Sequence, residues 1–203
     1  MKLYYMPGAC SLSPHIVARE AGLDLELDRL DHASMRTASG EDYRALNPKG
    51  YVPALRLDDG DLLTEGPVIV QYLADQAPAA GLIPAAGTRA RYHVQEMLSY
   101  ITSELHKTYS PLFNPASPPE LRAERIAYLQ RRYAPLEERL AAQPYLHGAQ
   151  FQVSDAYLFV VTHWARVLKL ELLSALPALQ AFQQRVAQRP AVQAAMRAEG
   201  LIK

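Results

Sequence analysis

The sequence has a single cysteine, Cys10, among its 203 residues. One cysteine excludes both an internal disulfide framework and a zinc site built from cysteines. The chain also has no charge excess, because 21 Lys and Arg residues balance 21 Asp and Glu residues. Since nucleic-acid binders owe much of their affinity to a basic excess, we expect no nucleic-acid partner.

Long hydrophobic runs are absent as well. The most apolar stretch, residues 156–162, is followed at once by His163 and Arg166, so it is too short to span a membrane. The apolar run at residues 3–6 is too short for the core of a signal peptide. The six histidines show no spacing typical of metal ligands. We therefore expect a cytoplasmic protein with no membrane contact and no metal.

The composition that is present is that of a globular protein, with 49% hydrophobic and 21% charged residues. In the first eighty residues, the pattern predicts strands and helices in the order β-α-β, a short helix, then β-β-α. Asp59-Gly60 predicts the turn of a hairpin, and Pro14 and Pro67 each suit a first helical turn. The predicted elements are strands near 2–6, 24–30, 54–57 and 61–64, and helices from Ser11 or Ser13 to Gly22, over 42–46 and from Pro67.

The second part of the chain differs in character. Residues 75–88 are rich in Pro, Ala and Gly, as a linker is, and no hairpin signal follows them. Helical periodicity is found over 89–109, 119–142, 154–168, 176–187 and 190–198. The sequence thus predicts an α+β domain over residues 1–80, a linker over 81–88 and an all-α domain over 89–203.

Cys10 is the first candidate functional residue. It follows Pro7-Gly8-Ala9 and comes just before the first predicted helix. Backbone N–H groups and the dipole at a helix N-terminus stabilise a thiolate and lower the pKa of a thiol. The alternative is a small, buried and inert thiol. No second cysteine is available for a dithiol redox pair.

Other candidates lie near predicted element ends. A cis peptide bond at Val52-Pro53 would expose the Val52 backbone for pairing with an extended ligand. Glu65, just before the helix at Pro67, could accept a ligand ammonium or simply favour the helix dipole. A polar stripe includes Ser103 and His106, which indicates either a solvated face or a cleft wall with His106 as a proton donor. His163 is predicted to be a core histidine, and Tyr109, Phe113 and Trp164 are candidate walls of an apolar pocket.

Four segments together resemble one known family. They are MKLYYMPGACSLSPH (1–15), NPKGYVPAL (47–55), LTEGPVI (63–69) and GAQFQVSDAYL (148–158). Along its full length the chain resembles the bacterial beta class of glutathione S-transferases. The resemblance implies a thioredoxin-like domain that binds glutathione, followed by a helical domain that contributes a hydrophobic substrate site. It also implies a homodimer that conjugates glutathione to hydrophobic electrophiles in detoxification.

The resemblance assigns roles to individual positions. Cys10 would face the glutathione sulfur, with Tyr51 and Val52 beside a cis Pro53 and with Val52 pairing with the cysteinyl backbone. Glu65 and Gly66 would hold the γ-glutamyl end. The helical domain would contribute Ser103, Glu104 and His106, with His106 nearest the thiol and catalytic together with Cys10. Tyr5 would not activate the thiol.

The sequence departs from the class pattern at three positions. Met35 stands where a lysine usually meets the glycine carboxylate, with Arg36 as a neighbouring substitute; Gly66 replaces a serine. Gln152 occupies a usual Ser or Thr N-cap, which leaves Asp155 to satisfy that helix end. Two alternatives to conjugation therefore remain: a glutathione-dependent thiol reductase that acts through a Cys10 mixed disulfide, and a non-catalytic binding protein of the same fold.

Overall fold

The computed structural model describes residues 1–203, which form two compact units. The first unit contains residues 1–83 and 188–203, and the second contains residues 84–187. No helix of either unit is both long and apolar enough to cross a membrane.

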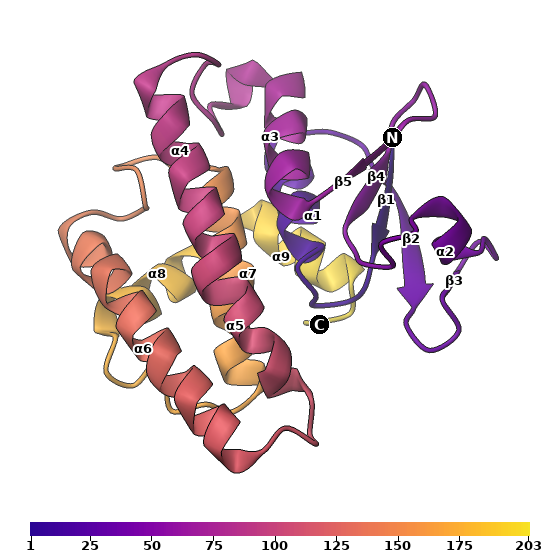
Figure 1. Cartoon of the computed structure of the whole chain (residues 1–203). Helices are drawn as coiled ribbons and strands as arrows, with labels where there is room; N and C mark the ends of the chain where they lie inside the picture. Colours follow the sequence, from indigo (N-terminus) through magenta and orange to yellow (C-terminus); the bar gives the residue numbers. More distant parts are fainter. The chain divides into compact units, whose positions relative to one another are not determined.

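A five-stranded mixed sheet in the order β3-β2-β1-β4-β5 forms the centre of the first unit (Figure 1). β1 pairs in parallel with β2 and antiparallel with β4, and β4 and β5 form the predicted hairpin around Asp59-Gly60. The two-residue strand β3 escaped the sequence pattern because it is too short to show an alternation. The strands are β1 (Lys2–Tyr5), β2 (Glu26–Asp31), β3 (Arg36–Thr37), β4 (Ala54–Arg56) and β5 (Leu62–Thr64).

Four helices complete the first unit: α1 (Leu12–Glu20), α2 (Tyr43–Leu46), α3 (Gly66–Gln76) and α9 (Pro190–Ala198). Both α3 and α9 pack against α1. The first seven residues of α1, from Leu12 to Ala18, are therefore buried on every side of the helix. Asp42 caps α2 by accepting from the N–H groups of Arg44 and Ala45.

The predicted domain boundary differs from the structure at the C-terminal end. The sequence pattern grouped residues 89–203 together, but residues 188–203 pack with the first unit. The reason lies in contacts that no local pattern reveals. Glu199 accepts from the Gly8 N–H at 2.9 Å and lies 2.9 Å from His15 Nδ1, and Arg189 forms an ion pair with Glu20 at 2.5 Å.

The second unit is all helical, as predicted. Its helices are α4 (Arg89–Tyr100), α5 (Lys107–Tyr109), α6 (Pro119–Ala142), α7 (Val153–Val167) and α8 (Pro177–Ala187). Short 3-10 turns come after α3 in the first unit, at Pro78–Ala80, and after α5 in the second unit, at Ser110–Phe113. The core of the second unit contains fully buried Leu129, Tyr133, Leu158 and Phe182.

The predicted continuous helix over 89–109 is interrupted. After α4, the segment Ile101–His106 is π-helical and leads into α5. Hydroxyl groups within and just after this segment bond to carbonyls one turn back: Thr102 to Leu98 at 2.8 Å and Thr108 to Glu104 at 2.8 Å. Such side-chain bonds compete with the regular helical ladder, and π-helical turns are frequent at functional sites.

The N-terminus of α7 is closed by Asp155, as the sequence indicated. This fully buried carboxylate accepts from the backbone N–H groups of Gln152 and Leu146, each at 2.8 Å. Asp155 therefore ties the preceding loop to the first turn of a buried helix.

Candidate active site

The turn that carries Cys10 connects β1 to α1. Ala9 N–H donates to the Met6 carbonyl at 3.1 Å, and Gly8 adopts a positive φ of 70° that favours glycine. The Ser11 hydroxyl bonds to both backbone groups of Met6, at 3.1 and 3.2 Å. Ser11 thus closes the turn and its side chain does not cap α1, while the Ser13 hydroxyl donates to the Cys10 carbonyl.

The Cys10 thiol is partly exposed and donates to the Val52 carbonyl at 3.2 Å. The Val52-Pro53 peptide bond is cis, as the resemblance implied. The backbone N–H of Val52 takes part in none of the hydrogen bonds of the structure. The fold therefore brings the thiol and an open backbone donor to the same turn, which argues against a merely buried, inert thiol.

The N-terminus of α3 lies beside this turn. A Cβ added to Gly66, the first residue of α3, would stand 3.6 Å from Pro53 Cγ, at ordinary contact distance. The structure shows no hydrogen bond from the Gly66 N–H, because the first N–H groups of a helix have no acceptor within the helix. This N–H belongs to the end of the helix that carries partial positive charge and receives carboxylates.

Glu65 precedes α3 with a positive φ of 69°, an uncommon conformation for a residue with a side chain. Its carboxylate does not cap the helix but lies 3.1 Å from Lys49 Nζ, which also donates to the Thr64 hydroxyl at 2.9 Å. The Tyr51 side chain is 71% exposed, and its carbonyl accepts from the Tyr43 hydroxyl at 2.7 Å. The backbone before Val52 is therefore held while the Tyr51 ring faces solvent.

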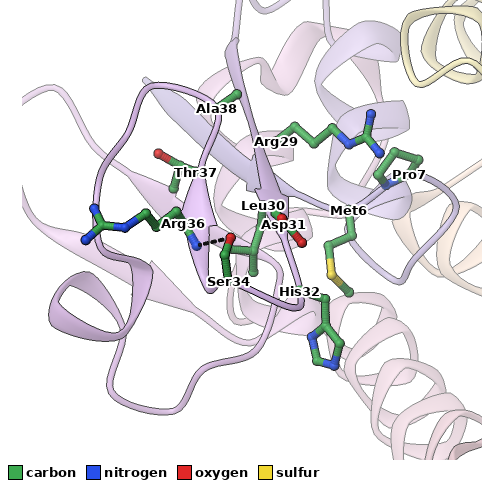
Figure 2. A pocket seen from close by; sticks show the side chains of 10 residues that line it. All are labelled: Met6, Pro7, Arg29, Leu30, Asp31, His32, Ser34, Arg36, Thr37 and Ala38. Atoms are coloured by element: carbon green, nitrogen blue, oxygen red, sulfur yellow. Dashed lines mark hydrogen bonds between the residues drawn. The ribbon is translucent and has the colours of Figure 1, made fainter.

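Met35 also has a positive φ, 53°. Its side chain packs against the buried cluster formed by Tyr4, Leu30, Tyr43, Val52 and Ala54. The Arg36 guanidinium donates to the Gly40 carbonyl at 3.1 Å, and Figure 2 shows it directed away from Met6 and Pro7. Arg36 is therefore engaged with its own hairpin and is poorly placed to substitute for a cation at position 35.

In the second unit, His106 ends the π-helical segment. Its Nδ1 lies 2.6 Å from the Tyr157 hydroxyl of α7, and the Trp164 ring meets it edge-on with centroids 4.9 Å apart. Tyr157 is buried, so its hydroxyl holds the imidazole in one orientation. A hydrogen bond at one ring nitrogen decides what the other nitrogen can donate or accept.

Ser103 and Glu104 precede His106 in the π-helical segment but bond elsewhere. Ser103 is exposed and donates to the Ser99 carbonyl at 3.1 Å. Glu104 accepts from the Tyr128 hydroxyl at 2.5 Å and pairs with Arg132 at 2.8 Å, and these contacts lower the pKa of the Glu104 carboxyl. Glu104 is thus tied to α6, whereas His106 is tied to α7.

The aromatic residues proposed as pocket walls have different environments. Tyr109 is fully buried, and its hydroxyl lies 3.1 Å from that of Tyr133, so it belongs to the core and not to a pocket. Phe113 is 46% exposed and packs edge-on against Trp164. His163 is half-buried and stacks on Phe159, and burial lowers the pKa of its imidazole.

Tyr5 is nearly buried, and desolvation raises the pKa of its hydroxyl, which suits packing better than proton transfer. Nowhere do three or more His, Cys, Asp or Glu side chains gather as metal ligands would.

The first unit brings four candidate residues into direct contact: Cys10, Val52, Pro53 and Gly66. Tyr51 and Glu65 are adjacent to them in the chain. Sequence reasoning missed Lys49, whose only signal was its place in the Asn-Pro-Lys-Gly turn.

Comparison with known proteins identifies this arrangement. The protein-family model of the glutathione S-transferase N-terminal domain matches residues 8–76. The family model of the glutathione S-transferase C-terminal domain matches residues 100–190. The glutathione S-transferase GstA of Escherichia coli O157:H7 is 48% identical over 201 residues, which cover 99% of this chain and 100% of GstA. The chain belongs to the glutathione S-transferase family. The sequence resemblance to this family is confirmed.

Solved structures of family members have the same fold. The bacterial transferase BphK, solved as a ternary complex, is 57% identical, with a TM-score of 0.97 over 99% of this chain and 100% of BphK. A beta-class transferase from Sphingomonas chungbukensis is 42% identical, with a TM-score of 0.95 over the whole of both chains. A sphingomonad transferase solved in complex with glutathione is 46% identical, also with a TM-score of 0.95 over both whole chains.

Proposed function

We propose that the chain binds glutathione and transfers its thiolate to hydrophobic electrophiles. The observation that carries this proposal is the group of donors at one turn of the first unit. Val52 and Gly66 present backbone N–H groups with no protein acceptor, beside the Cys10 thiol and the cis Pro53. The related sphingomonad transferase, solved with glutathione bound, supports glutathione as the ligand.

We assign a role to each residue, supported by its geometry or by the resemblance to the family. The Val52 N–H pairs with the backbone of the glutathione cysteinyl residue. The Gly66 N–H, at the start of α3, receives the γ-glutamyl carboxylate, and the exposed Glu65 carboxylate accepts the γ-glutamyl ammonium. Tyr51 covers the bound peptide, and Ser103, Glu104 and His106 belong to the helical half of the site. His106 acts on the thiol.

Catalysis consists mainly of stabilising a thiolate. A thiol has an ordinary pKa of about 8.5, so lowering it by two units requires about 2.7 kcal/mol of differential stabilisation. Three groups would stabilise the thiolate of glutathione: the Cys10 side chain, the N-terminus of α1 and the His106 imidazole. The thiolate then attacks an electrophilic carbon, the leaving group departs with its electron pair, and the thiol proton passes to solvent.

The partly exposed thiol of Cys10 also favours a second candidate activity, that of a glutathione-dependent thiol reductase, which exchanges thiols with disulfides. Here Cys10 would attack a disulfide sulfur of oxidised glutathione, form a mixed disulfide and release one glutathione thiolate. A third possibility is a binding protein without catalysis. Met35 packs against an apolar cluster at the position where the class usually has a lysine that meets the glutathione carboxylate.

Calorimetric titration with glutathione, followed by conjugation of 1-chloro-2,4-dinitrobenzene, separates these functions. Binding with conjugation supports the transferase, and binding without conjugation supports a reductase or a binding protein. Absence of binding at millimolar glutathione would reject both enzymatic functions.

A Cys10→Ala variant tests the role of the thiol. We expect it to lose the mixed disulfide with oxidised glutathione but to keep most conjugation, because glutathione supplies its own nucleophile. Mass spectrometry measures the adduct, and wild-type protein treated with dithiothreitol is the control. An adduct that persists on the variant contradicts the assignment, since the chain has no other cysteine.

We further propose a cytoplasmic detoxifying homodimer. The resemblance to bacterial transferases supports this proposal, and the single cysteine of the chain fits a reducing compartment. Analytical ultracentrifugation at micromolar concentration tests the assembly, and a monomer would contradict it.

A further inference from the structure

A cavity of about 560 Å³ opens at the edge of the sheet in the first unit. It lies where the parallel strands β1 and β2 end, between Met6-Pro7 and the segment that begins at Arg29 (Figure 2). The carboxyl ends of parallel strands are the common place for ligands in open α/β sheets. Its volume is in the range of small-molecule sites.

The cavity has an apolar part and a cationic part. Met6, Pro7 and the buried Leu30 provide the apolar surface. Arg29 provides the cationic part, beside the polar ring of His32, and the structure shows no hydrogen bond or ion pair for either side chain. In Figure 2, the Arg29 side chain extends toward Pro7 and the His32 ring lies near Met6.

The other charged groups of the lining are already engaged. Asp31 accepts from the Ala33 N–H at 2.9 Å, and this bond is the main reason why the pKa of its carboxyl is lowered. Arg36 donates to the Gly40 carbonyl. The charge of Arg29 also acts on the Asp31 carboxyl and on Tyr5, but the structure shows no hydrogen bond from its guanidinium. Arg29 is therefore the cation of the lining whose donors are left to meet a ligand.

The cavity borders the turn that holds the thiol. Met6, which lines the cavity, accepts from the Ala9 N–H, and Cys10 follows directly. We propose that this cavity receives the acceptor substrate and selects electrophiles that carry a carboxylate or sulfonate on an apolar, aromatic body. This inference rests on the proposed transferase function and adds a substrate class to it. Arg29 binds the anionic group, and Met6 and Pro7 contact the ring.

The reaction balances without a further reactant. For an aryl chloride, the glutathione thiolate forms a carbon–sulfur bond at the ring carbon that bears chlorine. Chloride leaves with the bonding electron pair, and the thiol proton goes to solvent. The carboxylate on the ring is unchanged, so Arg29 acts on specificity and not on the bonds that form and break.

The test compares a charged with a neutral aryl chloride: 4-chloro-3,5-dinitrobenzoate and 1-chloro-2,4-dinitrobenzene. We expect Arg29→Gln to lower kcat/KM for the benzoate about 1.4- to 5-fold, the size of a lost ion pair at an exposed arginine. The neutral substrate should be unaffected. The matched control is Arg36→Gln. It removes another cation from the same lining, but one whose guanidinium already donates to the Gly40 carbonyl. The Arg29 effect should shrink at high salt.

Binding of 3,5-dinitrobenzoate, which has no leaving group, provides a second measurement that does not need turnover. Calorimetry should show weaker binding to Arg29→Gln than to wild type and to Arg36→Gln. Equal loss for both substrates, or unchanged benzoate binding in Arg29→Gln, would overturn the assignment of the cavity. If wild type conjugates neither compound but binds the benzoate through Arg29, the transferase proposal fails and the anion site stands.

Discussion

At the scale of single residues, the glutathione site that we propose depends on backbone groups more than on side chains. Val52 and Gly66 contribute N–H groups, and both owe their placement to neighbours, the cis Pro53 and the first turn of α3. We therefore expect this site to tolerate substitutions that change side chains but keep the backbone. The glycine at position 66, where the class usually has serine, is an example, because a Cβ would fit at 3.6 Å from Pro53 without displacing it.

Met35→Lys tests whether position 35 faces the glycine carboxylate of glutathione. The lysine methylenes can keep the apolar contact of Met35 while the ammonium reaches solvent. A partly exposed ion pair contributes about 0.2–1 kcal/mol, so the dissociation constant for glutathione should fall about 1.4- to 5-fold. Calorimetry at low salt measures this change.

Met35→Leu is the control for that experiment, since it keeps size and apolarity without adding charge. The gain from lysine should shrink as salt rises. An unchanged dissociation constant in Met35→Lys at low salt would mean that position 35 does not meet the carboxylate. Because the Arg36 guanidinium is already bonded to the Gly40 carbonyl, we do not expect Arg36 to take its place.

At the scale of elements, the C-terminal helix α9 supports the turn that carries Cys10. Glu199, directly after α9, has a fully buried side chain that accepts from the Gly8 N–H and contacts His15 of α1. A second link, the ion pair between Arg189 and Glu20, is more exposed. The helix thus connects the last residues of the chain to the first loop.

We expect Glu199→Ala to lower the free energy of unfolding by about 3–5 kcal/mol, because it removes the carboxylate that meets a buried imidazole and a part-buried N–H. Urea denaturation measures this loss. Glu20→Ala, which removes the more exposed pair with Arg189, is the control and should cost about 1 kcal/mol. Similar losses in the two variants would contradict the special role of Glu199.

At the scale of the whole molecule, ionisable groups make stability depend on pH. Burial is the main cause that lowers the pKa of His147 to about 4, and the nearby cations Arg139 and His93 add to this. The His147 Nε2 atom is buried and has no hydrogen-bond partner. The pKa values of Asp28 and Glu41 are also lowered, mainly by hydrogen bonds to Ser39 and Tyr4 that outweigh burial.

The sign of the histidine effect follows from linkage. Below its ordinary pKa of about 6.5, His147 binds a proton in the unfolded chain but not in the folded one, so stability is full above pH 6.5 and is lost as pH falls toward 4. The half-exposed ring is screened by water, so the loss between pH 7 and pH 5 should be about 1 kcal/mol. The carboxylates extend the loss at still lower pH.

Urea denaturation between pH 7 and pH 4 measures this dependence. His147→Gln should flatten the curve between pH 6.5 and pH 5 and leave the steeper loss near pH 4. His32→Gln, at an exposed histidine of the other unit, is the control and should keep the wild-type curve. A wild-type curve in His147→Gln would mean that other groups control the acid response.

Local chemistry determined much of the fold before any tertiary contact was known. The Asp59-Gly60 hairpin, the prolines in the first turns of α1 and α3, and the Asp155 cap of α7 depend on residues close in sequence. For the same reason the motifs around Cys10, Val52-Pro53 and Glu65-Gly66 were recognisable, since each is a contiguous segment whose backbone is set by its own turn. The family followed from these motifs.

Tertiary structure alone decided the contacts that join distant segments. The pairing of Glu199 with His15, the bond of Glu104 to α6 and the burial of Tyr109 each depend on which faces of the helices meet. Hydrophobic periodicity marks an apolar face but not the partner that covers it. The cavity beside Arg29 has the same origin, because it exists only where two parallel strands end side by side.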